Sequence, residues 1–236
     1  MSRRGLIVAL AFATVFGLVF GFFPWLDVEI ARFFYDPVAK NFPLGRNAGL
    51  RYVRDAAVWI QALLIAPSVL ALLMPIAIPR VKPWMSSRAA IFLVATLALA
   101  PGLLVNVLLK NHWDRPRPAA VMEFGGNERF VPWWDPRGQC RKNCSFVSGE
   151  TSSAFWTLAP AALAPAPWRV LAYASAVAFG VGMAVVRMAM GGHFFSDVVF
   201  AGLFTFMIIV LVHGVIFRSR APESESKAAT SSKPAS

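Results

Sequence analysis

Three residues near the C-terminal end of the chain have side chains and a spacing that suit nucleophilic chemistry on an anion. Arg187, His193 and Asp197 lie in a short polar interruption between two long apolar runs. Ionisable groups at membrane depth are energetically costly and mark functional sites by default. If His193 and Asp197 begin the final helix, their four-residue interval puts both side chains on one face. The carboxylate then fixes the imidazole tautomer and raises its nucleophilicity, and Arg187 is free to bind an anion.

Two further motifs carry groups that bind anions, phosphate in particular. Lys110 and Arg117 are seven residues apart, and prolines flank the arginine and restrict its backbone. A guanidinium offers phosphate a planar fork of donors, and an ammonium offers a point charge. Downstream, Ser148-Gly149 leads into an apolar run. A Ser-Gly pair that opens a helix presents a hydroxyl and free backbone N–H groups, although such a pair is most often only a helix cap.

The elements that carry these motifs are expected to be membrane-spanning helices. Of the 236 residues, 57% are hydrophobic and 15% are charged, whereas soluble domains average roughly 45–50% apolar and about 25% charged residues. A helix needs about 20 residues to cross the hydrocarbon core. Six apolar stretches are candidates: Leu6–Trp25, Ala57–Pro79, Ala89–Leu109, about Phe146–Ala164, Val170–Met190 and Phe194–Phe217. The fourth is marginal because it contains a glutamate and a proline.

We therefore predict an all-α protein, a six-transmembrane-helix bundle that occupies residues 1–218. Its first helix is expected to be retained, because the apolar run ends in bulky residues rather than in a small-residue cleavage site. Residues 219–236, rich in Ser, Ala, Lys and Pro, are predicted to form a disordered cytoplasmic tail. The net charge of +11 comes without any nucleic-acid-binding module, so it suits a bilayer with anionic lipid head groups and not a nucleic acid.

The two cysteines indicate which side of the membrane the longest loop faces. Cys140 and Cys144 are the only cysteines, and they lie in one loop with no histidine near them. Two cysteines alone do not make a zinc site, whereas a disulfide requires an oxidising compartment. We predict a Cys140–Cys144 disulfide, which places this loop outside the cytoplasm. The short, basic segments at the opposite ends of the helices give weak support to the same orientation.

Taken together, the three motifs resemble those of the type 2 phosphatidic acid phosphatase family, which shares its site with the vanadium haloperoxidases. The matching patterns are Lys110-x6-Arg117-Pro118, Ser148-Gly149 and Arg187-x5-His193-x3-Asp197. The resemblance implies that His193 attacks phosphorus and that Asp197 orients the imidazole of His193. It also implies that a phosphohistidine forms at the membrane–water interface on the outer side of the membrane. It further implies a phosphate cradle without metal or other cofactor, built from Lys110, Arg117, Ser148, Gly149 and Arg187.

The sequence departs from the family pattern at three positions. Val147 replaces a proline and Val186 replaces a serine, whereas Glu150 replaces the histidine that protonates the leaving group in the family. Glu150 has three open roles: a general acid, a group that orients an arginine, or a residue favoured only by the helix dipole. Nearby cations lower a carboxyl pKa and burial raises it, so the sequence leaves the direction open. His112 is an alternative proton donor, and His213 is expected to be structural.

The loop Ala119–Asn143 bears on the substrate, because it carries Trp133, Trp134 and several basic residues that suit a large anionic head group. The Ser-Gly-Glu variant and the cysteine-bearing loop are similar to those of bacterial lipid A phosphatases, particularly the 4′-phosphatases. This resemblance implies an inner-membrane enzyme that faces the periplasm and acts on lipid A or another anionic phospholipid, with the 4′-phosphate favoured over the 1-phosphate.

Several alternatives remain open at this point. Undecaprenyl pyrophosphate and phosphatidylglycerol phosphate are alternative substrates. A vanadate-dependent peroxidase is disfavoured by the six apolar stretches, since those enzymes are soluble. A non-catalytic lipid-binding or transport protein is disfavoured by the paired His193 and Asp197, because binding alone needs neither a nucleophile nor its orienting group. The sequence gives no indication of the oligomeric state.

Overall fold

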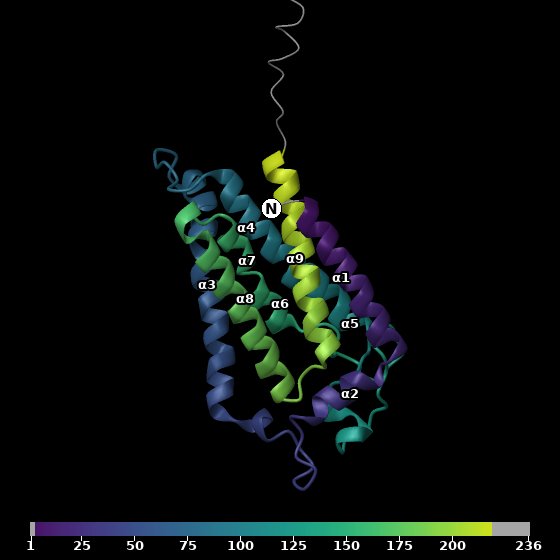
Figure 1. Ribbon diagram of the computed structural model, residues 1–236. Helices are drawn as coiled ribbons and strands as arrows, with labels where there is room; N and C mark the ends of the chain where they lie inside the picture. The colour runs from purple at the N-terminus through teal and green to yellow at the C-terminus, as the bar shows by residue number, and fades with distance from the viewer. Residues whose placement is uncertain (1–2, 219–236) are drawn as a thin grey trace, which may run out of the picture.

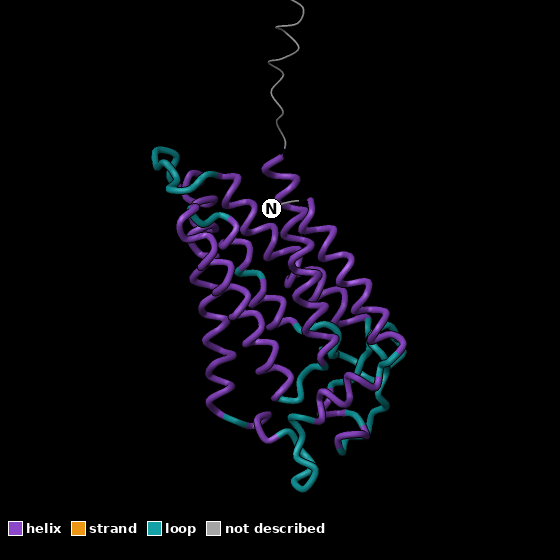
Figure 2. The backbone as a smooth tube through the Cα atoms, viewed as in Figure 1, coloured by secondary structure: helices purple, strands orange, loops and turns teal. Residues whose placement is uncertain are grey.

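The computed structural model describes residues 3–218, so the predicted tail lies outside the described residues. Within that range the fold is all-α, without a β-strand (Figures 1 and 2). Five helical segments are long and apolar enough to cross a membrane, and their outward faces expose large apolar side chains as a lipid-facing surface does. These segments are α1 (Arg3–Phe22), α3 (Ala48–Ala77), α4 with its continuation (Ser87–His112), α8 (Ala166–Ala189) and α9 (Phe195–Arg218).

The fourth apolar stretch does not form the single helix that the sequence analysis predicted. It is divided into α6 (Gly149–Phe155) and α7 (Leu158–Ala162). Pro160 has no N–H to bond the Trp156 carbonyl, and the N–H of Ala159 bonds that carbonyl instead at 2.8 Å, in a tighter turn. The predicted sixth membrane-spanning helix is therefore not confirmed at this stretch. The α6–α7 pair instead fills the middle of the bundle, in contact with α4, α8 and α9.

The polar part of the molecule is gathered at one end of the bundle. Figure 1 shows the first turn of α1 and the last turn of α9 at the opposite end. The polar end carries α2 (Trp25–Arg32) and the short 3₁₀ helices η1 (Pro43–Arg46), η3 (Pro118–Ala120) and η4 (Met122–Phe124), with the loops around them. Segments that are far apart in the sequence therefore meet here.

Tryptophan side chains fasten the long loop 113–148 to the bundle. The indole of Trp133 donates a hydrogen bond to the Gly17 carbonyl on α1 at 3.2 Å, and the indole of Trp134 donates to the Gly21 carbonyl at 3.3 Å. Trp113 donates to the backbone carbonyl of Trp133 at 2.6 Å. The rings of Trp113 and Trp133 pack beside a phenylalanine cluster shared by α1, α9 and the loop. The loop thus has a fixed position over the polar end.

The continuation of α4 presents the first motif. It is a π-helix, η2 (Ala98–Leu109), followed by the single turn α5 (Lys110–His112). The Asn106 side chain donates to the carbonyl of Pro101 at 2.7 Å, which satisfies an acceptor inside the wider helical turns. The π-helix ends where Lys110 begins, so this irregular segment sets the direction from which the lysine enters the site.

Candidate active site

The candidate nucleophile, His193, is fully buried between α8 and α9. Its Nδ1 atom lies 2.7 Å from the backbone carbonyl oxygen of Ser145. Because a carbonyl oxygen only accepts hydrogen bonds, Nδ1 carries the proton and Nε2 keeps its lone pair. Nε2 is buried and has no hydrogen-bond partner among the described residues. The imidazole is therefore held in the tautomer that leaves Nε2 free for attack.

Asp197 contributes to this arrangement indirectly, and not by the contact that the sequence analysis expected. Its Oδ2 atom is 3.9 Å from Nδ1 of His193, beyond hydrogen-bond distance. The same oxygen accepts hydrogen bonds from the Ser145 hydroxyl at 2.5 Å and from the Phe194 N–H at 2.8 Å. The helix α9 begins only at Phe195, so His193 precedes it and the two residues do not share a helix face. Asp197 fixes Ser145, and Ser145 fixes the imidazole.

Arg115 also lies in this region, although it belongs to none of the three motifs. Its guanidinium is fully buried and donates to Asp197 at 2.5 Å, to Asp27 of α2 at 2.8 Å and to the Ser196 hydroxyl at 2.8 Å. Asp27 in turn accepts hydrogen bonds from the Ser196 backbone N–H and hydroxyl. We call Asp27, Arg115, Ser145, Ser196 and Asp197 the closed network, because their charged groups bind one another.

Burial alone would lower the pKa of Arg115, but the carboxylates of Asp197 and Asp27 outweigh it and raise the pKa above its usual value. Arg115 therefore stays a cation. One sequence signal pointed to this network: an aspartate directly after the first apolar run, at a position where an unpaired charge is costly.

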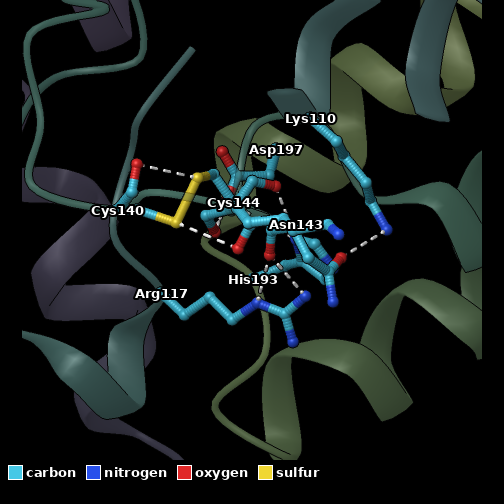
Figure 3. Close-up of a disulfide and its surroundings, with 9 residues drawn as sticks. Lys110, Arg117, Cys140, Asn143, Cys144, His193 and Asp197 are labelled. Atoms are coloured by element: carbon cyan, nitrogen blue, oxygen red, sulfur yellow. Dashed lines mark hydrogen bonds and ion pairs between the residues drawn. A yellow bond between two sulfur atoms is a disulfide. The ribbon is translucent and has the colours of Figure 1, made fainter. Parts of the chain in front are cut away.

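The cationic residues of the first motif are held by Asn143, which the sequence analysis did not identify. Lys110 donates to the Asn143 side-chain oxygen at 3.3 Å, and Arg117 donates twice to its backbone carbonyl, at 2.8 and 3.2 Å. Figure 3 shows the lysine and the arginine reaching Asn143 from opposite sides. Asn143 has a left-handed backbone (φ 55°) between Cys140 and Cys144, which are joined by a disulfide with a Cα–Cα distance of 5.7 Å.

The third motif and Glu150 form the opposite wall. Nε of Arg187 is 3.6 Å from Oε2 of Glu150, and the same oxygen is 4.0 Å from Nε2 of His193. Burial alone would raise the pKa of the Glu150 carboxyl, but Arg187, Lys110 and Arg117 outweigh it and lower the pKa below its usual value. Glu150 is therefore a carboxylate in the free protein at neutral pH. The structure brings it together with Arg187 and His193.

The same cations act on the nucleophile. Burial lowers the pKa of His193 well below its usual value, and Arg187, Arg117 and Lys110 lower it further. The imidazole is therefore neutral at physiological pH. A neutral imidazole keeps the nitrogen lone pair that a nucleophile needs, and burial and the cations favour this form.

The second motif shapes the wall between Glu150 and Lys110. The Ser148 hydroxyl accepts hydrogen bonds from the Thr151 N–H at 3.3 Å and from the Thr151 hydroxyl at 2.9 Å, so it caps α6. A side chain at Gly149 would place its Cβ 2.7 Å from the Asn106 side-chain oxygen and 3.0 Å from Nζ of Lys110. Glycine at this position lets the lysine approach the start of α6.

Comparison with known proteins identifies the family. Residues 89–221 match the PAP2 superfamily. The chain is also 38% identical over 225 residues to a protein named lipid A 4′-phosphatase from Francisella tularensis subsp. novicida (strain U112), covering 93% of this chain and 99% of that relative. The chain belongs to the PAP2 superfamily. It is 39% identical over 115 residues to a lipid A 4′-phosphatase of Rhizobium leguminosarum, covering 49% of each chain. No solved structure matches.

The PAP2 site leaves three buried polar atoms without a hydrogen-bond partner: Oε2 of Glu150, Nε of Arg187 and Nε2 of His193. Two of these atoms belong to the third motif, and the other belongs to Glu150, where this chain departs from the family pattern. Together with the cations Lys110 and Arg117 they form what we call the open cradle. Buried polar atoms normally have partners, so a group of unpartnered atoms in one place indicates where a ligand binds.

The two remaining histidines lie apart from the open cradle. His112 is exposed, and its Nδ1 atom is 2.8 Å from the Leu108 carbonyl of its own helical segment. The ring of His213 packs against those of Phe92 and Phe217. Of Glu150, His112 and His213, only Glu150 lies beside His193. Within residues 3–218 no cluster of three or more His, Cys, Asp or Glu side chains is arranged to hold a metal ion.

Proposed function

We propose that this PAP2 protein hydrolyses the 4′-phosphate monoester of lipid A. The observation that carries the proposal is the open cradle, where an imidazole nitrogen, an arginine N–H and a carboxylate oxygen are buried without hydrogen-bond partners. A phosphoryl group supplies what each of them lacks: an electrophilic centre for His193, an acceptor for Arg187 and a proton for Glu150. The relative named lipid A 4′-phosphatase, which aligns along 99% of its length, supports this substrate.

In the first step Nε2 of His193 attacks phosphorus as the bond from phosphorus to the sugar oxygen breaks. Lys110, Arg117 and Arg187 stabilise the charge on the three equatorial oxygens, and the Gly149 N–H at the start of α6 adds a further donor. In the second step water attacks the phosphohistidine, the P–N bond breaks, and inorganic phosphate leaves. No metal takes part in either step.

The departing sugar oxygen needs a proton, and Glu150 of the free protein has none to give. A phosphate monoester has a second pKa of about 6, so its monoanion brings one proton into the site. We infer that Glu150 takes this proton and passes it to the leaving oxygen. It accepts a proton from water in the second step and passes it to the departing phosphate, which balances the reaction.

We further propose that the polar end of the bundle faces the periplasm, in the bacterial inner membrane. The Cys140–Cys144 disulfide in the long loop supports this orientation, because disulfides persist in oxidising compartments. The open cradle would then lie at the membrane–water interface on the periplasmic side of the inner membrane. A lipid could reach it from the bilayer with its chains still among the apolar helix faces.

Phosphate release by the purified protein in lipid nanodiscs tests the proposal. The panel contains lipid A with only a 4′-phosphate, lipid A with only a 1-phosphate, undecaprenyl pyrophosphate and phosphatidylglycerol phosphate, each with and without a metal chelator. We expect the fastest release from the 4′-phosphate lipid, unaffected by the chelator. His193→Gln protein, prepared identically, controls for contaminating phosphatases. Release from another panel member with none from the 4′-phosphate lipid would overturn the assignment.

A further inference from the structure

A cavity opens beside the open cradle; Lys110 and Glu150 line it and His193 does not. Its volume is about 140 Å³, and it lies between α3, the π-helix η2 and α6. It shares Lys110 and Glu150 with the cradle, and its other polar lining residues are Arg54, Gln61, Asn106 and Ser153. We call it the side cavity. The side cavity and the open cradle share two residues. When the phosphate of a lipid is bound in the cradle, the neighbouring atoms of that lipid are therefore within reach of the side cavity.

The α3 wall of the side cavity is one continuous helix face. Arg54, Ala57, Val58 and Gln61 are spaced at three- and four-residue intervals, which puts their side chains in one row. Ser153 lies three residues after Glu150 on α6, again on one face. Helical periodicity therefore brings these polar side chains to the same cavity from one face of α3 and one face of α6.

Gln61 has an unusual position for an uncharged polar side chain. It lies thirteen residues into α3, about 20 Å along the helix at roughly 1.5 Å per residue, and so at bilayer depth. The residues two positions away on either side, Trp59 and Leu63, are exposed large apolar side chains. The Gln61 carboxamide and the Ser153 hydroxyl form no hydrogen bond with any part of the chain that the structure describes. An unpaired carboxamide away from water is costly, so these two groups are suited to a ligand.

The cavity wall also has the shape of a binding site. The bare Gly149 forms its inner side, where a Cβ atom would come within 2.7 Å of the Asn106 side-chain oxygen. Asn106 itself is fixed, because its amide nitrogen donates to the Pro101 carbonyl. The inner wall is thus rigid and open, and the free donors of Gln61 and Ser153 line the rest.

We propose that the side cavity binds an acyl-linkage carbonyl of the substrate, the ester or amide oxygen through which a fatty chain is attached next to the phosphate. This inference rests on the proposed function and names the part of the lipid that is recognised beyond the phosphate. A carbonyl oxygen at bilayer depth accepts from the Gln61 carboxamide and the Ser153 hydroxyl. Lipid A meets the requirement, because its phosphorylated sugars carry ester- and amide-linked chains.

The test compares substrate selectivity in Gln61→Leu and Ser153→Ala proteins. The measured quantity is kcat/KM for 4′-phosphorylated lipid A divided by kcat/KM for p-nitrophenyl phosphate, which has no acyl carbonyl. Loss of one hydrogen bond should lower this ratio about three- to tenfold in each variant. Thr14→Val is the matched control, because it removes a hydroxyl from α1 that bonds only its own helix and does not line the side cavity. The control ratio should equal that of the wild type.

A fully deacylated lipid A supplies the second arm. It keeps the phosphorylated sugars but has no acyl carbonyl, so the variants and the wild type should hydrolyse it with the same relative efficiency. An unchanged lipid A ratio in both variants, or an equal deficit on the deacylated substrate, would overturn the inference. Absence of lipid A hydrolysis by the wild-type protein would overturn the proposed function itself, and the inference with it.

Discussion

The closed network and the open cradle lie side by side, yet they treat buried polar atoms in opposite ways. In the closed network Arg115 is fully buried and its donors reach Asp27, Asp197, Ser196 and the Val131 carbonyl. In the open cradle, buried atoms of Glu150, Arg187 and His193 have no hydrogen-bond partner. Both regions take residues from the long loop 113–148, Arg115 and Ser145 for the closed network and Arg117 for the open cradle. They differ in how their buried side chains are paired.

The two regions have different roles: the closed network holds the site in place, and the open cradle is left to bind a ligand. A fully satisfied polar network is rigid, because moving any member leaves a buried charge unpaired. That rigidity reaches the reactive atom through two contacts: Asp197 holds the Ser145 hydroxyl, and the Ser145 carbonyl holds Nδ1 of His193. The cradle atoms are thereby fixed in place without using their own hydrogen bonds, which stay available to the phosphoryl group.

Removal of the nucleophile is the most severe way to break the open cradle. His193→Ala should lower turnover by at least about 10⁴-fold, because no other side chain can form the phosphorylated intermediate. The closed network does not include the imidazole, so the variant should still unfold cooperatively in detergent. Its melting temperature should fall, because the buried ring and its bond to the Ser145 carbonyl are lost. Brief exposure to ³²P-labelled lipid should label the wild-type protein in an acid-labile form and leave the variant unlabelled. Labelling of the variant would assign the nucleophile to another residue.

The role of Glu150 can be sharpened by the leaving group. If Glu150 passes a proton to the departing oxygen, Glu150→Gln should slow hydrolysis of an alkyl phosphate about 10²–10⁴-fold. The loss should be much smaller with p-nitrophenyl phosphate, whose phenolate needs little protonation. Single-turnover rates on both substrates measure the step in which phosphohistidine forms. An equal loss on both would indicate that Glu150 orients Arg187, 3.6 Å away, and would contradict the proton relay.

The open cradle was easier to foresee from the sequence than the closed network. Its members are side chains with distinctive chemistry in three short motifs, and the structure brings Lys110, Arg117, Arg187 and Glu150 to one place around His193. Their catalytic roles stay predictions. The all-α class and the membrane-spanning helices also followed from composition, since long apolar runs have few alternatives.

The missed features depend on contacts that residue types do not encode. Asp27 and Arg115 are 88 residues apart and meet only because α2 packs under the long loop. The acceptor for Nδ1 of His193 is a backbone carbonyl, which every residue has. Asn143 likewise holds Arg117 through its backbone. The sequence of the fourth stretch does not show whether its helix bends at Pro160 or is divided there into two helices.

The closed network can be weakened without touching the cradle. Asp27→Asn removes one carboxylate from Arg115 and should lower the free energy of unfolding by about 3 kcal/mol, because it breaks a buried ion pair. Glu29→Gln is the matched control on the same helix: it removes an exposed pair with Arg32, and such pairs contribute about 0–1 kcal/mol. Denaturant titration in detergent measures both. Similar losses of unfolding free energy in the two variants would show that the buried Asp27–Arg115 pair stabilises the protein no more than an exposed pair does.

The smallest expected effect is a shift of the acid limb of the pH–rate profile. Neutral His193 is the reactive form, so activity falls as pH drops through its pKa, which burial and the cradle cations hold well below the usual value. Arg117→Gln removes one of these cations, which should raise the pKa of His193 and move the acid limb of kcat/KM to higher pH.

The control is Arg137→Gln, which removes a cation of the same loop that is paired with Asp135 in solvent and should leave the limb in place. Ionisation of the substrate is common to all three proteins, so a difference between normalised profiles reports on the enzyme. A limb that stays in place in Arg117→Gln would mean that burial alone keeps the imidazole neutral, and that the cradle cations serve only the phosphoryl group.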